Sequence, residues 1–282
     1  MGNHLLLLYT ECMPKKRSVA PSSSAATPSK PDPNVILGGK TCEIQSPNQR
    51  IQQWLTRPHA PTTAATSLFQ GMDGSMSWRI FRILSEFVEG FDFLSRHTKT
   101  VTFFGSARCS FASYGYQQAK KLGFLLGKEG FTIITGGAPG VMEAGNWGAY
   151  EAGAPSVGLN IQLPHEERKN QYVKESIAFQ HFFTRKVMLS AAAQAYVYFP
   201  GGFGTLDELF EIVTLIQTGK IANKVPIVLV GKKFWTPMFD WIRSEMWDEN
   251  LFIDKQDINL MTLVDSAEEA HEVIMAAKHE MA

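Results

Sequence analysis

The chain has 282 residues, of which 44% are hydrophobic, so it is long enough to bury a sizeable core in one or two domains. Lys and Arg number 27, and Asp and Glu also number 27. This balance of charge excludes a general nucleic-acid binder and a protein held on acidic membranes by a basic surface. Small molecules are therefore the expected partners.

Cysteine content and hydropathy bear on the compartment. Cys12, Cys42 and Cys109 form no CxxC pair and are too few for a disulfide framework. No apolar run reaches the ~18 uncharged residues that a membrane span needs, and the run at residues 5–9 is too short for the core of a signal peptide. We expect a cytoplasmic protein with no membrane segment.

Residues 1–70 differ from the rest of the chain in composition. They carry seven Lys or Arg and three Asp or Glu, and 11 of the 21 residues from Pro14 to Asn34 are Pro, Ser or Thr. Few large apolar side chains offset an ordering entropy of about 1–2 kcal/mol per residue. We predict a disordered N-terminal tail over residues 1–70 and a single folded domain over residues 71–282.

The folded region begins with an amphipathic helix. From Trp78 onwards, apolar residues recur at the three-, four- and seven-residue spacing of one helical face: Ile80, Ile83, Leu84, Phe87, Val88, Phe91 and Leu94. Nearly all-apolar runs follow, as expected of strands covered on both faces, at residues 100–104, 131–135, 156–161, 195–199 and 225–230. Helices are predicted between and after them, at residues 114–128, 141–152, 185–193, 206–217, 237–249 and 266–277. This alternation predicts an α/β fold with a Rossmann-like, doubly wound parallel sheet.

Three strand-to-helix turns are the places to look for chemistry, because ligands of such sheets bind beyond the carboxyl ends of the strands. The candidate binding residues are Gly105 and Ser106 in the first turn, Gly136 and Gly137 in the second, and Gly201, Gly202, Gly204 and Thr205 in the third. Glycines let backbone N–H groups approach an anion, and the following helix adds unpaired N–H groups and a positive dipole end. A lone glycine pair is more often only a tight turn, but two such turns on neighbouring strands favour a ligand site.

The spacing of the glycines limits what this ligand can be. Neither glycine-rich turn ends in the Gly-Lys-Ser/Thr of a Walker A motif, and neither has the GxGxxG spacing of a dinucleotide site. One phosphate group, most simply that of a nucleoside monophosphate, is the predicted ligand.

Charged residues flank these turns. Thr205 and Glu208 have the spacing of a capping box, in which Thr205 caps the helix. At the lip of a cleft, Glu208 would also be placed to activate water or to face a developing cation. Thr184 is the expected N-cap of the following helix, so Arg185 would lie in its first turn. A cation there opposes the helix dipole, and a charge that is locally unfavourable indicates a role in binding a ligand.

Other polar residues give weaker signals. Lys186 and Glu143 are two further candidate binding residues, and Arg108 lies near the first turn. Glu143 follows the second turn, where it is either a surface acid that complements the helix dipole or part of the site. The stretch from His165 to Lys169 lacks the second histidine of a zinc HExxH helix, so we predict no metal site.

The run from Pro200 to Glu208 resembles the PGGxGTxxE signature of the LOG ("lonely guy") family. The resemblance extends from about residue 77 to about residue 275 and includes the FGSAR turn, the second glycine turn and the Arg185-Lys186 pair. It implies a phosphoribohydrolase that cleaves the N-glycosidic bond of cytokinin riboside 5′-monophosphates and AMP, with no metal or organic cofactor. The long helix before the first strand is similar to the longer, bacterial-type branch of the family.

The resemblance also implies roles for individual residues. Arg185 and Glu208 fall on the catalytic positions, and the PGGxGT turn falls on the 5′-phosphate site. Ala138 departs from the pattern, because many relatives have a third glycine there, and its methyl group is expected to narrow the pocket. A homodimer or larger assembly, with the site near the subunit interface, is implied as well.

Three other functions compete with this reading of the sequence. A general purine or pyrimidine nucleoside 5′-monophosphate nucleosidase differs only in whether the pocket admits an N6-prenyl group, and the sequence leaves both open. Carriers of the same fold, such as molybdenum-cofactor carriers, bind a nucleotide-like ligand without cleaving it, and the presence of both Arg185 and Glu208 argues against that class. A lysine decarboxylase is disfavoured because nothing marks a Schiff-base lysine.

Overall fold

The computed structural model describes residues 76–162, 169–222 and 225–281, all of which lie within the unit Ile44–Ala282. The predicted tail, its boundary after residue 70 and His165 fall outside these residues. None of the helices in the described ranges is long and apolar enough to cross a membrane.

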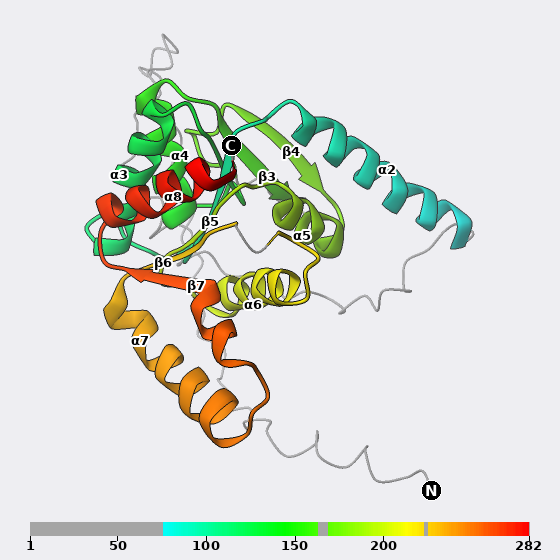
Figure 1. The fold of residues 1–282 in the computed structure, drawn as a ribbon. Coiled ribbons are helices and arrows are strands. Elements are labelled where there is room, and N and C mark those ends of the chain that lie inside the picture. Colours follow the sequence, from blue (N-terminus) through cyan, green and yellow to red (C-terminus); the bar gives the residue numbers. More distant parts are fainter. Residues whose placement is uncertain (1–75, 163–168, 223–224, 282) are drawn as a thin grey trace, which may run out of the picture. The chain divides into compact units, whose positions relative to one another are not determined.

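Seven parallel strands form one sheet in the order β4-β3-β2-β1-β5-β6-β7 (Figure 1). The strands are β1 Thr100–Phe104, β2 Thr132–Thr135, β3 Ser156–Ile161, β4 Glu175–Phe179, β5 Tyr196–Tyr198, β6 Ile227–Val230 and β7 Met261–Val264. The order along the sheet reverses between β1 and β5, which makes their carboxyl ends the switch point where such sheets bind ligands.

Helices follow most of the strands, and between β3 and β4 the described residues contain none. They are α2 Met76–Ser95, α3 Tyr114–Lys128, α4 Val141–Ala152, α5 Phe182–Ala191, α6 Phe203–Gln217, α7 Lys232–Trp241 and α8 Ala267–Met281. A π-helical segment, Ile242–Glu249, follows α7, and a 3₁₀ segment, Lys255–Leu260, precedes β7. The helix predicted to begin at Pro237 begins five residues earlier, so the proline lies inside α7.

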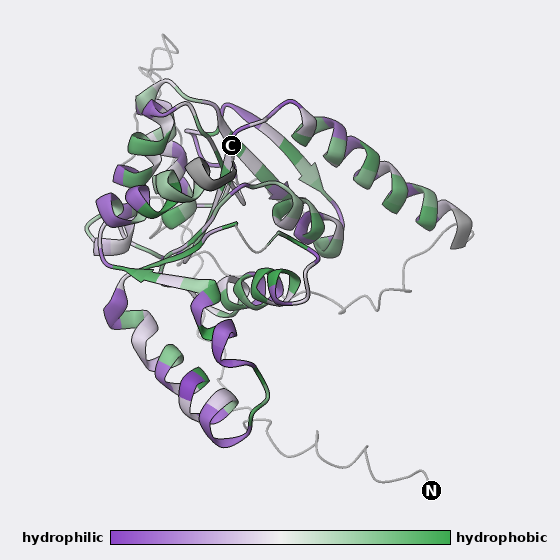
Figure 2. Ribbon diagram, viewed as in Figure 1, coloured by the Kyte–Doolittle hydropathy of each residue, from purple (hydrophilic) through white to green (hydrophobic). Residues whose placement is uncertain are grey.

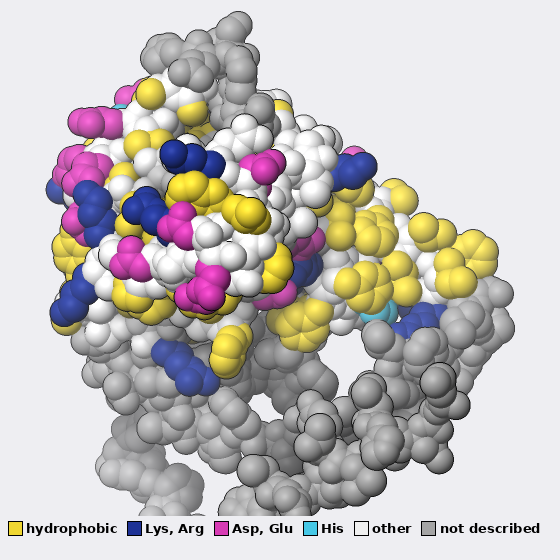
Figure 3. All heavy atoms as spheres, turned by 60° about the horizontal axis from the view of Figure 1, so that its bottom comes forward, with side chains coloured by type: hydrophobic (Ala, Val, Ile, Leu, Met, Phe, Trp, Pro, Cys, Tyr) yellow, Lys and Arg dark blue, Asp and Glu magenta, His cyan; other side chains and the backbone are white. Residues whose placement is uncertain are grey.

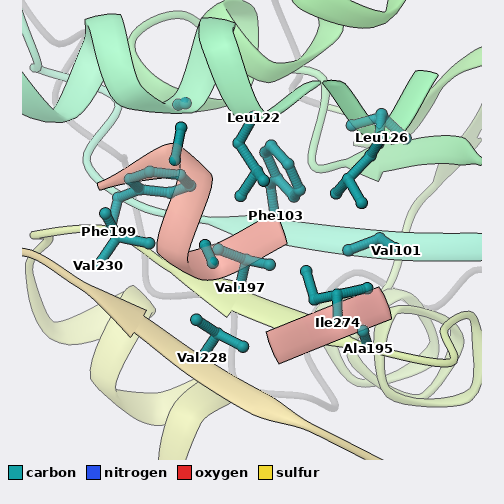
Figure 4. Close-up of a cluster of buried hydrophobic side chains, with 14 of the residues drawn as sticks. Val101, Phe103, Leu122, Leu126, Ala195, Val197, Phe199, Val228, Val230 and Ile274 are labelled. Carbon is teal, nitrogen blue, oxygen red and sulfur yellow. The ribbon is translucent and has the colours of Figure 1, made fainter. Parts of the chain in front are cut away.

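Successive side chains of the central strands enter two different cores. Val101 and Phe103 of β1 pack with residues of α3, α4 and α8, whereas Phe104 packs with residues of α5, α6 and α7. Figure 4 shows the first of these cores, in which Phe103 lies beside Leu122 of α3. Each large side chain buried in this way contributes ~1.5–3 kcal/mol. Helices cover both faces of the sheet, and the predicted α/β, Rossmann-like, doubly wound parallel sheet is confirmed.

The strands that the sequence did not predict, β4 and β7, are the two edges of the sheet. The central strands β1, β2, β5 and β6 are buried throughout and consist of apolar, aromatic and threonine residues with no charge among them. In β4 the first two residues, Glu175 and Ser176, are exposed, and in β7 Thr262 is exposed. Because β4 and β7 are partly exposed, they contain polar residues, and the search for apolar runs in the sequence did not find them. In Figure 2, the ribbon of β4 (labelled in Figure 1) carries both hydrophilic and hydrophobic colours.

Candidate active site

A cavity of about 510 Å³ lies at the switch point, next to the carboxyl end of β1 and the turn that follows β5. This volume is typical of small-molecule sites. Of the residues predicted to bind substrate or to catalyse, the cavity is lined by Gly105, Ser106, Gly136, Arg185, Gly202, Gly204, Thr205 and Glu208. The three turns and α5 thus meet around one space.

Backbone hydrogen bonds join the three turns to one another. The N–H of Ser106 in the first turn donates to the carbonyl of Pro200 in the third, at 3.1 Å. The carbonyl of Ser106 accepts from the N–H of Val141, the first residue of α4, also at 3.1 Å. The first turn is therefore fixed to both glycine-rich turns, and it holds the rim of the cavity in place.

The third turn leads into α6, whose N-terminus faces the cavity. The helix begins at Phe203 with Gly202 as its N-cap, and no side chain in the described part of the chain caps it. The capping box predicted for Thr205 and Glu208 is therefore wrong, because Thr205 already lies inside the helix and its N–H donates to the carbonyl of Gly202 at 2.9 Å. The N–H groups of Phe203 and Gly204 precede the first bond within the helix, which is the position from which helix N–H groups bind anions.

The glycines of the turns divide into two groups. Gly105, Gly136 and Gly201 are required by packing, since a Cβ would meet Val141, the guanidinium of Arg185 and the side chain of Thr205, respectively. A Cβ added to Gly202 or Gly204 would meet no atom within 4 Å, and neither residue has a positive φ. Neither packing nor backbone geometry demands a glycine at these two positions, so the close approach of a ligand is the remaining reason for them.

Glu208 projects from the first turns of α6 into the cavity. Its Oε2 atom is buried and has no hydrogen-bond partner among the described residues. Burial raises the pKa of its carboxyl to about 7, against the positive charges of Lys186 and Arg185, which lower it. A carboxyl with a pKa near neutrality, at a cavity wall, is suited to exchange a proton with a ligand or with water.

Arg185 projects from α5 and also lines the cavity. Its Nε donates to the carbonyl of Leu159 at 2.7 Å, and its guanidinium lies against Gly136. Burial lowers the pKa of Arg185, and the negative charge of Glu208 acts in the opposite direction. Thr184 was predicted to cap this helix, but α5 begins at Phe182 and His181 is its N-cap. Arg185 therefore lies one turn into the helix.

Four predicted binding residues do not line the cavity. Lys186 forms ion pairs with Asp207 at 2.6 Å and Glu211 at 2.9 Å. Glu143 is buried in the first turn of α4, with 1% of its surface exposed. Gly201 packs on Thr205, and Gly137 has a φ of +70° and faces Asn160. Arg108, which gave only a weak signal, does line the cavity.

Sequence reasoning missed the apolar part of the wall. Phe104, Met142, Phe182, Leu189 and Phe203 line the cavity. Phe182 is 66% exposed and Phe203 is 92% exposed, and each is the first residue of its helix. In the sequence these residues cannot be told from core residues. The one available signal is that Phe203 lies between two glycines of a turn, where the core does not need a phenylalanine.

The chain is similar to proteins of known family. The family model described as "Possible lysine decarboxylase" matches residues 142–274. The protein named cytokinin riboside 5′-monophosphate phosphoribohydrolase LOG from rice, Oryza sativa subsp. japonica, is 30% identical over 151 residues, which are 52% of this chain and 61% of that protein. The cytokinin riboside 5′-monophosphate phosphoribohydrolase of Mycobacterium marinum is 27% identical over 154 residues, or 54% of this chain and 81% of that protein.

A solved structure shares the fold. The molybdenum cofactor carrier protein of Chlamydomonas reinhardtii superposes with a TM-score of 0.50 at 20% identity, covering 64% of this chain and 99% of that one. The match to the rice protein spans about three fifths of that protein's length. The named plant and bacterial relatives are LOG-type phosphoribohydrolases, and over about half of its length the chain is similar to proteins of the LOG family.

Proposed function

We propose that the chain is a hydrolase that cleaves the N-glycosidic bond of cytokinin riboside 5′-monophosphates, and of AMP, to the free base and ribose 5-phosphate. The observation that carries the proposal is the placement of Arg185, Glu208 and the uncapped N-terminus of α6 around one cavity. The rice and Mycobacterium relatives are named for a phosphoribohydrolase activity on cytokinin riboside 5′-monophosphates, which supports it.

The N-terminus of α6 is the proposed phosphate site. Its open N–H groups and positive dipole end favour an anion by ~0.3–2 kcal/mol. Gly202 and Gly204 leave the space that phosphate oxygens would occupy. Arg185, which also lines the cavity, adds a positive group that can donate charge-assisted hydrogen bonds to the ribose or the phosphate.

Glu208 is the proposed catalytic carboxylate. In the reaction, the bond between C1′ and the base nitrogen breaks, its electron pair passes to the base, and the base takes up a proton. Water forms the new bond to C1′ and gives up a proton, which Glu208 can accept in its ionised form. The same carboxylate stabilises the positive charge that develops on the ribose as the base departs. General-base catalysis of this kind contributes about 10²–10⁴-fold in rate.

The lining of the cavity disfavours lysine decarboxylation. None of the described residues around it is a lysine, and the nearby Lys186 is held between Asp207 and Glu211. A pyridoxal phosphate enzyme needs a lysine that forms a Schiff base with the cofactor. The apolar residues at the mouth, Phe182 and Phe203, instead suit a base with a hydrophobic substituent.

Release of ribose 5-phosphate from AMP and from isopentenyladenosine 5′-monophosphate tests the proposal. The wild type is expected to cleave both and to prefer the prenylated substrate, and Glu208→Ala and Arg185→Ala are expected to be inactive on both. Equal rates on the two nucleotides would favour a general nucleoside monophosphate nucleosidase. Tight AMP binding without cleavage would favour a carrier and refute the catalytic roles.

We propose further that the chain forms a homodimer or a larger assembly. Large apolar side chains on α2, including Trp78, Phe81 and Phe91, are more than half exposed, as at subunit interfaces. Light scattering at micromolar concentration should give at least twice the monomer mass of 31.4 kDa. A monomer would contradict this part of the proposal.

A further inference from the structure

Helix α2 is held against the rest of the domain at a few points. Gly90 of α2 is buried, and a Cβ there would lie 2.6 Å from Sδ of Met188 in α5 and 3.1 Å from a ring carbon of Phe179 in β4. Most large apolar side chains of α2 are exposed, and Figure 3 shows them gathered on the surface over this helix. Phe87, Phe93 and Leu94 pack against the core that contains Met188 of α5, and Gly90 and Glu86, one turn before it, lie on the side of α2 that meets α5.

Glu86 of α2 binds the residues at which α5 begins. His181 is the N-cap of α5, but its own side chain makes no capping hydrogen bond. The carboxylate of Glu86 accepts from the backbone N–H of Gln180 at 2.9 Å and of His181 at 3.4 Å. It also accepts from the hydroxyl of Thr184, and its Oε1 lies 3.1 Å from Nδ1 of His181. A side chain from another helix thus binds the N–H of the N-cap residue, as the N3 glutamate of a capping box does within its own helix.

The surroundings of Glu86 keep this carboxylate ionised. Burial raises its pKa, but the hydrogen bonds from Thr184, Gln180 and His181 outweigh burial, so the pKa lies below its ordinary value. Only 13% of the side chain is exposed. An ionised carboxylate at this place also complements the positive end of the α5 dipole.

The first turn of α5, which Glu86 contacts through His181 and Thr184, is the turn that carries Arg185. The N–H of Arg185 donates to the carbonyl of His181 at 3.2 Å, which closes the first turn of α5 on the residue that Glu86 holds. From there the Arg185 side chain reaches Leu159 and Gly136 at the cavity wall. The direction of the guanidinium therefore depends on where this turn begins.

We propose that Glu86 is a positioning residue, which fixes the first turn of α5 and so aims Arg185 into the cavity. The role rests on the proposed function, because Arg185 acts only if the cavity binds a nucleotide. It gives α2, which lies before the matched residues 142–274, a part in the site without contact with the ligand.

Steady-state kinetics on AMP with Glu86→Ala, Glu86→Gln and the control Glu89→Ala test the proposal. Glu89 is an exposed carboxylate one turn further along α2, and its variant should behave as the wild type. Glu86→Ala is expected to raise KM about tenfold. A tenfold change corresponds to about 1.4 kcal/mol, which lies within the range for loss of a hydrogen-bonding side chain at a helix end. Glu86→Gln, which keeps an acceptor oxygen, should recover much of this loss. A lower apparent kcat at unchanged KM would indicate only a smaller folded fraction and would overturn the proposal.

A double-mutant cycle separates an effect through Arg185 from a general one. If Glu86 acts through Arg185, Glu86→Ala should have little further effect on AMP affinity in an Arg185→Ala background. A full tenfold loss in both backgrounds would refute the positioning role.

Hydrogen exchange keeps this test distinct from that of the proposed function. Amide exchange in the first turn of α5 should be faster in Glu86→Ala than in Glu89→Ala, whether or not the wild type cleaves AMP. If the wild type is inactive but this difference is found and AMP affinity falls, the proposed function fails and the positioning role stands. Equal exchange in the two variants would overturn the positioning role.

Discussion

Replacement of Glu208 by glutamine should stabilise the protein at alkaline pH. Glu208 is partly buried in the cavity wall, and its Oε2 has no hydrogen-bond partner among the described residues. Burial raises its pKa from 4.5 to about 7, so above neutral pH the folded protein bears the cost of a poorly solvated charge. A neutral amide of the same shape removes that cost. The expected gain is a sign that the carboxylate is held for function rather than for stability.

The sign and size follow from proton linkage. Because the pKa of Glu208 is higher in the folded protein than in the unfolded chain, the protonated carboxyl contributes stability below about pH 4.5, and this contribution is lost as the pH rises through about 7. A pKa difference between 4.5 and about 7 corresponds to ~3 kcal/mol at 1.36 kcal/mol for each tenfold change in proton affinity. Partial access to solvent reduces the expected gain to ~2 kcal/mol.

Urea unfolding of the wild type and Glu208→Gln at pH 5 and pH 8 measures this effect. At pH 8 the variant should be more stable by ~2 kcal/mol, or melt about 4–8 °C higher, and at pH 5 the two should differ by less than ~1 kcal/mol. Glu272→Gln, which neutralises an exposed carboxylate of α8, is the control and should show no such dependence. The reasoning would be refuted if Glu208→Gln were less stable than the wild type at pH 8. It would also be refuted if the difference in free energy of unfolding between the two proteins were the same at pH 5 and pH 8.

Three further predictions concern the turn, the pH profile and the tail. Gly204→Ala should leave the melting temperature unchanged or slightly higher, because a Cβ there meets no atom within 4 Å. The same methyl group should raise KM for AMP about tenfold or more, because it would occupy the phosphate site. An unchanged KM would place the phosphate elsewhere. The kcat/KM for AMP should rise with pH through about 7 as Glu208 ionises, and a Glu208→Gln variant that kept this limb would assign it to another group. Deletion of residues 1–70 should leave kcat/KM within about twofold of the full chain, given the composition of that segment; a dead or aggregated product would show that it folds onto the domain.

The sequence predicted the centre of the sheet better than its edges. The five predicted strands correspond to β1, β2, β3, β5 and β6, whose side chains are mostly buried and hence apolar. Helix ends were less well predicted because caps are decided in three dimensions. Thr184 and Thr205 have the chemistry of N-caps, but the N-cap of α5 is His181, whose N–H is bound by Glu86 of another helix, and the N-cap of α6 is Gly202.

The candidate site was predicted where backbone chemistry alone marks it. Arg185 and Glu208 stood out as charges near helix N-termini, and both line the cavity. Glu143 and Lys186 have similar positions in the sequence, yet one is buried in α4 and the other is bound by Asp207 and Glu211. Which charged side chain is free to meet a ligand depends on neighbours far apart in the sequence.

A crystal structure of Glu208→Gln with AMP would test the central claim most directly. The account predicts that phosphate oxygens lie about 3 Å from the N–H groups at the start of α6, and that the bond between ribose and adenine lies between the side chains at positions 185 and 208. AMP bound outside this cavity, or with its phosphate away from Gly202 and Gly204, would contradict it.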